Sequence, residues 1–231
     1  MKKILVLMAI LLLAWAGTSW AATIGNTKHD LSSTSTASVK ASTQGEICIF
    51  CHTPHKASPA GGRPVWNHTL DAGTALTWNP TATVRGTTLP IIATDSKLGS
   101  SIACLSCHLG TMALGDVLVY YSGTSSAATN FAIAASSKVT ANKLNSTSSA
   151  YIDPANMSKN HPVGVAKPAN VAGYTNFKAT PTAPIKYYPD STGAGEYVGC
   201  PSCHNPHDNT TAPFLKTSNA ASALCISCHD L

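Results

Sequence analysis

The stretch Cys48-Ile49-Phe50-Cys51-His52 has two cysteines three positions apart, followed directly by a histidine. The same arrangement recurs three more times, at 104–108, 200–204 and 225–229. The four copies use all eight cysteines of the chain and four of its nine histidines. Because nothing is left over from the cysteine set, each copy is interpreted as one binding unit.

Cys-x-x-Cys-His is the attachment signature of c-type haem. Two thiols form thioethers with the porphyrin vinyl groups, and the adjoining imidazole becomes the proximal iron ligand. The sequence therefore predicts four haem c groups per chain, each with its iron. The predicted thioether residues are Cys48, Cys51, Cys104, Cys107, Cys200, Cys203, Cys225 and Cys228. The predicted proximal iron ligands are His52, His108, His204 and His229.

Zinc sites and disulfides are the alternatives for this cysteine pattern. An all-cysteine zinc site has no need for a histidine after each second cysteine, yet all four motifs carry one. In an oxidising compartment vicinal thiols left free would also oxidise, which disfavours a zinc site there. The pattern thus favours haem over both alternatives.

The first residues of the chain have the features of a secretory signal. Lys2 and Lys3 are followed by an apolar run over 4–16 and by Ser19-Trp20-Ala21, a small-x-small cleavage pattern. The apolar run is too short to span a bilayer, and no later segment suggests a membrane span. We expect a Sec-type signal peptide over 1–21 and an extracellular or outer-surface protein, with the periplasm as the alternative.

Composition predicts the fold class. Charged residues make up 11% and aromatic residues 6% of the chain, so the polypeptide lacks the side chains of an ordinary core. We expect a mostly irregular, haem-organised cytochrome c with short helical turns at the motifs and few short strands. Candidate strands, each rich in β-forming residues and bounded by turns, are 90–94, 117–121 and 183–188.

The net charge of +5 does not indicate nucleic acid binding. Cleavage would remove Lys2 and Lys3, and haem propionates would bring the charge close to neutral. The sequence also lacks a basic cluster with interleaved aromatic residues.

The chain contains an internal duplication. In each half a histidine precedes a first site that reads Cys-x-x-Cys-His-x-Pro-His and a second that reads Cys-x-Ser-Cys-His. A stretch rich in Ser, Ala and Asn lies between the halves. The predicted organisation is a first two-haem half over 22–121, a connecting stretch over 122–160 and a second two-haem half over 161–231. Shared haem contacts are expected to fuse the halves into one unit.

The remaining histidines supply a complete ligand set. Two six-coordinate haems need four axial ligands, and each half has four histidines when His68 is set aside. The predicted distal ligands are His29, His55, His161 and His207. A histidine three residues after a proximal one cannot easily fold back over its own haem, so we expect His55 and His207 to bind the second haem of their own half. His29 and His161 would then bind the first haem.

Methionine is the competing axial ligand. Beyond the signal peptide only Met112 and Met157 remain, and neither recurs at matching places in the two halves. We expect packing roles for both. Bis-histidine ligation implies low potentials and leaves no open iron position, which favours electron transfer over enzymatic catalysis.

These residues resemble a known family. The order Ile-Cys-Ile-Phe-Cys-His-Thr-Pro-His, Pro-Val-Trp-Asn, Cys-Leu-Ser-Cys-His, His-Pro-Val, Cys-x-Ser-Cys-His-Asn-Pro-His and Cys-Ile-Ser-Cys-His-Asp is similar to the doubled CxxCH multihaem cytochromes of metal-reducing bacteria. Four haems on a chain of this size resemble the OmcE-type tetrahaem cytochromes, which polymerise into extracellular nanowires. The resemblance implies an electron-conducting filament, and periplasmic relatives share the motifs.

The expected partners are other c-type cytochromes, further copies of this chain joined head to tail, and metal oxide or electrode acceptors. The alternatives are a monomeric periplasmic electron shuttle and a multihaem reductase. The fourth motif lies two residues from the C-terminus and His29 lies close to the predicted mature N-terminus, so His29 could ligate a haem of its own or of a neighbouring subunit.

Overall fold

The fold has short elements joined by irregular segments. The computed structural model describes residues 24–55, 65–71, 76, 83–84, 87–88, 101–122, 125–157, 160–166, 177–189 and 196–230. The predicted signal peptide lies outside these residues. The helices are η1 (Cys48–Phe50), α3 (Ser101–His108), α4 (Cys200–Cys203), η3 (Ala220–Ser222) and α5 (Ala223–Ile226). Within the described residues no helix has both the length and the apolar character needed to cross a membrane.

Each of the four motifs lies on a helical turn, namely η1, α3, α4 and α5. The residue before the second cysteine is buried in all four: Phe50, Ser106, Ser202 and Ser227. The serines are held by short local bonds, as when Ser106 Oγ donates to the Ile102 carbonyl at 2.8 Å. Ser227 Oγ donates to the Ala223 carbonyl at 2.9 Å in the same way. These turns bring both cysteines of a motif to the same side of the segment.

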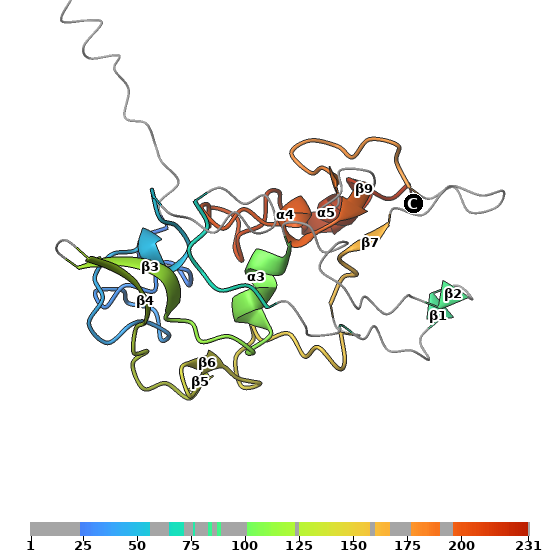
Figure 1. The fold of residues 1–231 in the computed structure, drawn as a ribbon. Coiled ribbons are helices and arrows are strands. Elements are labelled where there is room, and N and C mark those ends of the chain that lie inside the picture. Colours follow the sequence, from blue (N-terminus) through green and yellow to red (C-terminus); the bar gives the residue numbers. More distant parts are fainter. Residues whose placement is uncertain are drawn as a thin grey trace, which may run out of the picture.

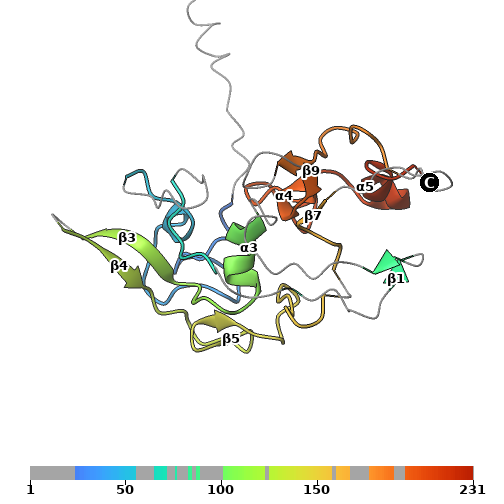
Figure 2. The ribbon, with the colours of Figure 1, turned by 45° about the vertical axis from the view of Figure 1, so that its right-hand side comes forward.

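The strands form small antiparallel sheets. They are β1 (Thr83–Val84), β2 (Thr87–Thr88), β3 (Asp116–Ser122), β4 (Ser125–Asn130), β5 (Val139–Thr140), β6 (Lys143–Leu144), β7 (Val165–Ala166), β8 (Tyr188–Pro189) and β9 (Glu196–Val198). β1 pairs with β2, β3 with β4 and β5 with β6, while β9 lies between β7 and β8. In Figures 1 and 2, α3 lies between the β3–β4 hairpin and the group formed by α4, α5 and β9.

The three predicted strands have different outcomes. The strand expected over 117–121 lies inside β3, whereas the one expected over 90–94 lies outside the described residues. The prediction over 183–188 is wrong except at Tyr188, where β8 begins. Pro184 has no N–H to donate, and the amide of Ile185 donates to the Thr182 carbonyl at 3.1 Å in a turn instead of to a strand.

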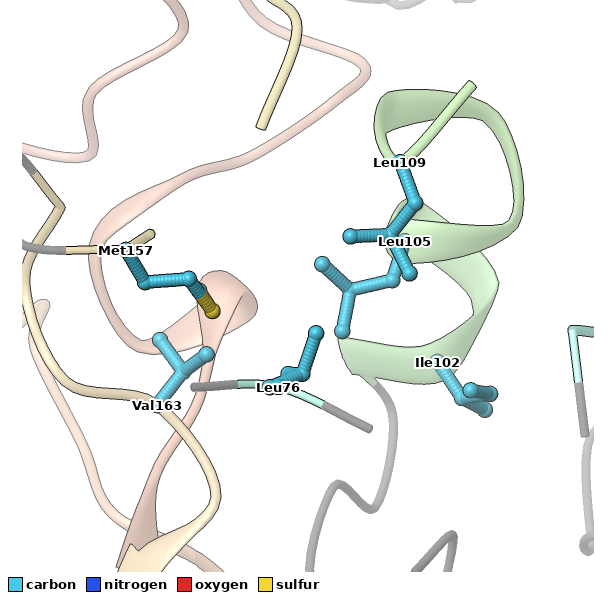
Figure 3. Packing of buried hydrophobic residues seen from close by; sticks show 6 residues of the cluster. All are labelled: Leu76, Ile102, Leu105, Leu109, Met157 and Val163. Atoms are coloured by element: carbon cyan, nitrogen blue, oxygen red, sulfur yellow. The ribbon is translucent and has the colours of Figure 1, made fainter. Parts of the chain in front are cut away.

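The larger hydrophobic cluster packs against α3. It consists of Leu76, Ile102, Leu105, Leu109, Met157 and Val163. Figure 3 shows Leu105 of α3 pointing towards Met157 and Val163. Cys200, the first residue of α4, packs against the edge of this cluster. The packing role predicted for Met157 agrees with its 1% exposure.

The stretch predicted as a connection, 122–160, carries ordered structure. It contains β4, β5 and β6, and its buried Ile133 and Leu144 form a second cluster with Leu114. The amide of Ile152 donates to the carbonyl of His108 at 2.8 Å. Through these contacts the stretch packs against the first half.

Asn67 ties the first motif to β3. Its side chain is fully buried, and Nδ2 donates to the carbonyls of Ile49, at 2.8 Å, and Val119, at 3.0 Å. Its Oδ1 accepts the Val119 amide at 2.9 Å, and its own amide donates to the carbonyl of Cys51 at 2.9 Å. Every side-chain polar group of Asn67 is thus used to hold η1 against β3.

We expect Asn67→Ala to lower the free energy of unfolding by about 3 kcal/mol, because it leaves buried carbonyls and an amide without partners. Asn145→Ala is the matched control, since Asn145 also bonds through its side chain but is only half-buried and its bonds are exposed. The control should cost under about 1 kcal/mol. Denaturant unfolding followed by circular dichroism measures both, and equal losses would contradict the assigned role of Asn67.

Candidate functional site

The eight motif cysteines are all free of disulfide bonds. Within the described part of the chain, no three His, Cys, Asp or Glu side chains converge in a way that could hold a metal ion by themselves. Pairs of free thiols on a helical turn, each followed by an imidazole, are the donor set that haem c requires.

The second and third motifs meet where α3 contacts α4. The Cys104 and Cys200 thiols are neighbours, and their interaction raises the pKa of Cys104 and lowers that of Cys200. Ser101 Oγ accepts the amide of Cys200 at 2.9 Å. A Cβ at Gly199 would lie 2.8 Å from Ser101 Oγ, so only glycine permits this approach.

The first motif lies near the second, and the fourth lies near the third. Burial raises the pKa of the Cys107 thiol, and the nearby Cys51 raises it further. Burial likewise raises the pKa of Cys203 to about 11, with Cys228 as the next contributor. Together with the α3–α4 contact, these neighbours connect the motifs in the order first, second, third, fourth. In Figures 1 and 2, α3, α4 and α5 follow one another across the molecule in that order.

Backbone carbonyls fix two of the motif imidazoles. His108 Nδ1 lies 2.7 Å from the Ala150 carbonyl, and His204 Nδ1 lies 3.0 Å from the Pro213 carbonyl. A carbonyl can only accept, so Nδ1 carries the proton and Nε2 keeps its lone pair. This second-shell bond is the one that orients a histidine for metal ligation.

The first motif differs, because its imidazole nitrogen has no such partner. His52 Nδ1 and Trp66 Nε1 are buried side-chain nitrogens without a hydrogen bond in the described part of the chain. The two rings meet edge to face, with centroids 6.0 Å apart. Burial lowers the pKa of His52, although the Val65 carbonyl nearby favours the charged form. Orphaned polar atoms at this place fit a site that is completed by a bound group.

Two predicted distal histidines lie beside motif histidines. The His29 and His108 rings are 6.0 Å apart between centroids, and the His52 and His207 rings are 5.9 Å apart. The sequence predicts His29 beside the first motif and His207 beside the fourth, so the observed neighbours differ from the expected ones. Both contacts are long-range, which local spacing does not reveal.

The other two predicted distal ligands, His55 and His161, are exposed. Among the described residues no ring contact joins either of them to a motif histidine. His161 Nδ1 lies 2.8 Å from the Pro162 carbonyl, which again leaves Nε2 with its lone pair. Their roles as distal ligands stay predictions.

The His29–His108 pair favours neutral imidazoles. Burial, followed by the His108 charge, lowers the pKa of His29 to about 4. Burial also lowers the pKa of His108. Both rings are therefore neutral at pH 7, and the neutral ring is the form that binds a metal.

His68, the histidine set aside in the ligand count, is 1% exposed. Its Nδ1 lies 2.8 Å from the Thr69 carbonyl, and its Nε2 lies 3.1 Å from the Ala113 carbonyl and 3.4 Å from Cys107 Sγ. Because both ring nitrogens face acceptors, neither is directed at an open ligand position. This geometry favours a structural role beside the second motif.

We expect His68→Ala to leave the low-spin absorption spectrum of the loaded protein unchanged while lowering the free energy of unfolding by about 2–4 kcal/mol, through lost hydrogen bonds and a cavity. His29→Ala is the control and should generate high-spin haem. Ultraviolet–visible spectra and denaturant unfolding measure both effects. A high-spin haem produced by His68→Ala, but not by His29→Ala, would reverse the two roles.

Several residues that build the site carry no sequence signature of their own. Ser101 joins α3 to α4, and Phe214 stacks on His29 with ring centroids 4.3 Å apart. Asn67 belongs to the Pro-Val-Trp-Asn segment that supports the family resemblance. That segment was the one feature of the sequence that could have drawn attention to Asn67.

Comparison with known proteins identifies one segment. The family model described as a doubled CXXCH motif (Paired_CXXCH_1) matches residues 194–231, which include the third and fourth motifs. No curated protein matches the chain. The match and the motif chemistry together indicate covalently bound haem c, and the doubled motif is the pattern of multihaem c-type cytochromes, which transfer electrons.

Proposed function

We propose that this protein is an exported tetrahaem cytochrome c that carries electrons along a row of four bis-histidine haems. The observation that supports it is the neighbour order of the motif sulfurs: Cys51 lies near Cys107, Cys104 near Cys200, and Cys203 near Cys228. Cofactors attached to adjacent sulfurs lie close together, and closeness is what electron transfer between them requires. The contact of Cys104 with Cys200 makes the middle step one between the two halves.

The chain's own residues would hold and orient each haem. The cysteines would anchor it through thioethers, and the bonds from His108 and His204 to backbone carbonyls would keep Nε2 directed at the iron position. Bound haem iron supplies reversible one-electron chemistry. Two imidazoles per iron would fill the axial positions, so we propose a carrier and not an enzyme.

We further propose head-to-tail assembly into an extracellular filament, with other cytochromes and metal oxides or electrodes as redox partners. The family resemblance and the exposure of the fourth motif support this. Cys225 is exposed, and the Ile226 side chain is 44% exposed. A fourth haem at this place would have an edge available to a neighbouring molecule, and a heterologous contact that does not close yields a filament.

Purified protein from a host that matures c-type cytochromes should carry four covalent haems, one for each motif. The pyridine haemochrome assay and intact mass measure this number. The ferric spectrum should be entirely low-spin. A five-coordinate fraction that binds nitrite or carbon monoxide would favour the reductase instead.

Native mass spectrometry and electron microscopy test the assembly. A monomer that persists at high concentration would favour the periplasmic shuttle.

A further inference from the structure

One loop of the second half contacts both haem sites of the first half. Resting on the proposed function, we propose that His207 is the distal ligand of the iron bound by His52, and that His29 is the distal ligand of the iron bound by His108. The Pro206 carbonyl, next to His207 in the same loop, orients His29. The first half would thus depend on the second for both of its distal positions.

The ring separations match this assignment. A first-row metal binds an imidazole nitrogen at about 2.0–2.1 Å, so two imidazoles on opposite sides of one metal have centroids roughly 6 Å apart. The His52–His207 separation is 5.9 Å, and the His29–His108 separation is 6.0 Å. Each pair joins one motif histidine to one histidine outside the motifs.

In the His29–His108 pair, hydrogen bonds leave the Nε2 atoms free to bind a metal. His29 Nδ1 lies 3.4 Å from the Pro206 carbonyl, and His108 Nδ1 lies 2.7 Å from the Ala150 carbonyl. Each Nδ1 therefore donates its proton to a carbonyl, and each Nε2 keeps its lone pair for a metal. The bond from His29 crosses 177 positions of the sequence.

The loop is braced so that both contacts form together. The Asn205 amide donates to the carbonyl of Phe214 at 2.8 Å, and the Phe214 amide donates to Asn209 Oδ1 at 3.0 Å. The Phe214 ring, 6% exposed, stacks on the His29 ring with an interplanar angle of 24°. The His207 amide donates to Asn205 Oδ1 at 3.2 Å. One hydrogen-bonded loop therefore positions the His207 ring and supports His29.

Sequence spacing suggests the fourth motif for His207 and the first motif for His29; this assignment moves His207 to the first motif and His29 to the second.

The test uses the haem-loaded chain with His207→Gly. Thioethers keep a haem attached without its distal ligand, so the haem count should stay at four while one haem of the four becomes high-spin. Added imidazole should restore the low-spin spectrum, which separates a lost ligand from a misfolded chain. A spectrum unchanged by His207→Gly would overturn the proposal.

The identity of the affected haem comes from combining variants. With Cys48 and Cys51 both replaced by alanine, His207→Gly should produce no further high-spin haem, because its partner haem is already absent. With Cys225 and Cys228 replaced instead, the high-spin haem should persist. The opposite result would assign His207 to the fourth motif and overturn the proposal. The same comparison tests His29, using the variant that lacks Cys104 and Cys107.

Electron paramagnetic resonance gives an independent readout. The rings of His52 and His207 are 20° from parallel, whereas those of His29 and His108 are 84° apart. Near-perpendicular imidazole planes leave two iron d orbitals almost equal in energy, which produces a strongly anisotropic low-spin signal. His29→Gly should therefore remove such a signal, and His207→Gly should remove a rhombic one.

A chain that carries no haem would refute the proposed function itself, whereas four haems with other pairings would refute only this assignment.

Discussion

Replacing both Cys104 and Cys107 by alanine should remove one of the four proposed haems and destabilise the chain more than loss of the haem proposed at the fourth motif does. The helix that carries these cysteines, α3, supplies Ile102, Leu105 and Leu109 to the larger hydrophobic cluster. Large-to-small changes of single core side chains cost about 2–5 kcal/mol, so loss of a whole porphyrin should cost at least about 5 kcal/mol. That is a large share of the stability of a typical domain.

The matched control replaces Cys225 and Cys228 by alanine. It also deletes two thioethers and one haem, but α5 has no buried residue and Cys225 is exposed. The control should keep most of the stability and only shorten the row of haems, whereas the loss at α3 interrupts it. Intact mass gives the haem number, and denaturant unfolding gives the stability. Equal destabilisation by the two variants would contradict the central position of α3.

Local features of this fold could be predicted from short stretches of sequence. The Cys-x-x-Cys-His spacing indicated compact turns, and all four motifs lie on helical turns. The β-forming residues at 117–121, bounded by turns, lie inside β3. Both depend on neighbours along the chain, whose geometry the spacing restricts.

Contacts between distant residues could not be predicted in this way. The ligand count within each half suggested partners inside that half, yet His207 of the second half lies beside His52 of the first, and His29 bonds to Pro206. Spacing sets how far a histidine can reach but not which of several motifs it meets. The ordered packing of 122–160 was hidden for a related reason, because its small and polar composition resembles a linker while Ile133 and Leu144 are buried.

The structural roles of two small polar residues could not be predicted from the sequence either. Asn67 and Ser101 have no chemical signature, and each becomes structural only where two segments meet. These side chains stabilise the fold by hydrogen bonding to buried backbone groups. Predicting this role requires the positions of those groups, which the sequence does not give.

Blocking haem attachment at all four motifs will remove cooperative folding altogether. With every motif cysteine replaced by serine, the described part of the chain retains hydrophobic clusters of only six and three buried residues, and its sheets have two or three strands each. Isolated hairpins of this size are marginal in water, and the small clusters cannot offset the conformational entropy of ordering the chain.

The serine variant should therefore show a disordered far-ultraviolet dichroism spectrum, no thermal transition, and digestion by protease under conditions that the loaded protein survives. The loaded wild-type chain from the same host is the control for the influence of expression and purification. Serine is close in size to cysteine, so the change tests the absence of the porphyrin more than a change in side-chain volume. A sharp cooperative transition in the haem-free variant would mean that the polypeptide has a sufficient core of its own. Haem would then not be required for folding.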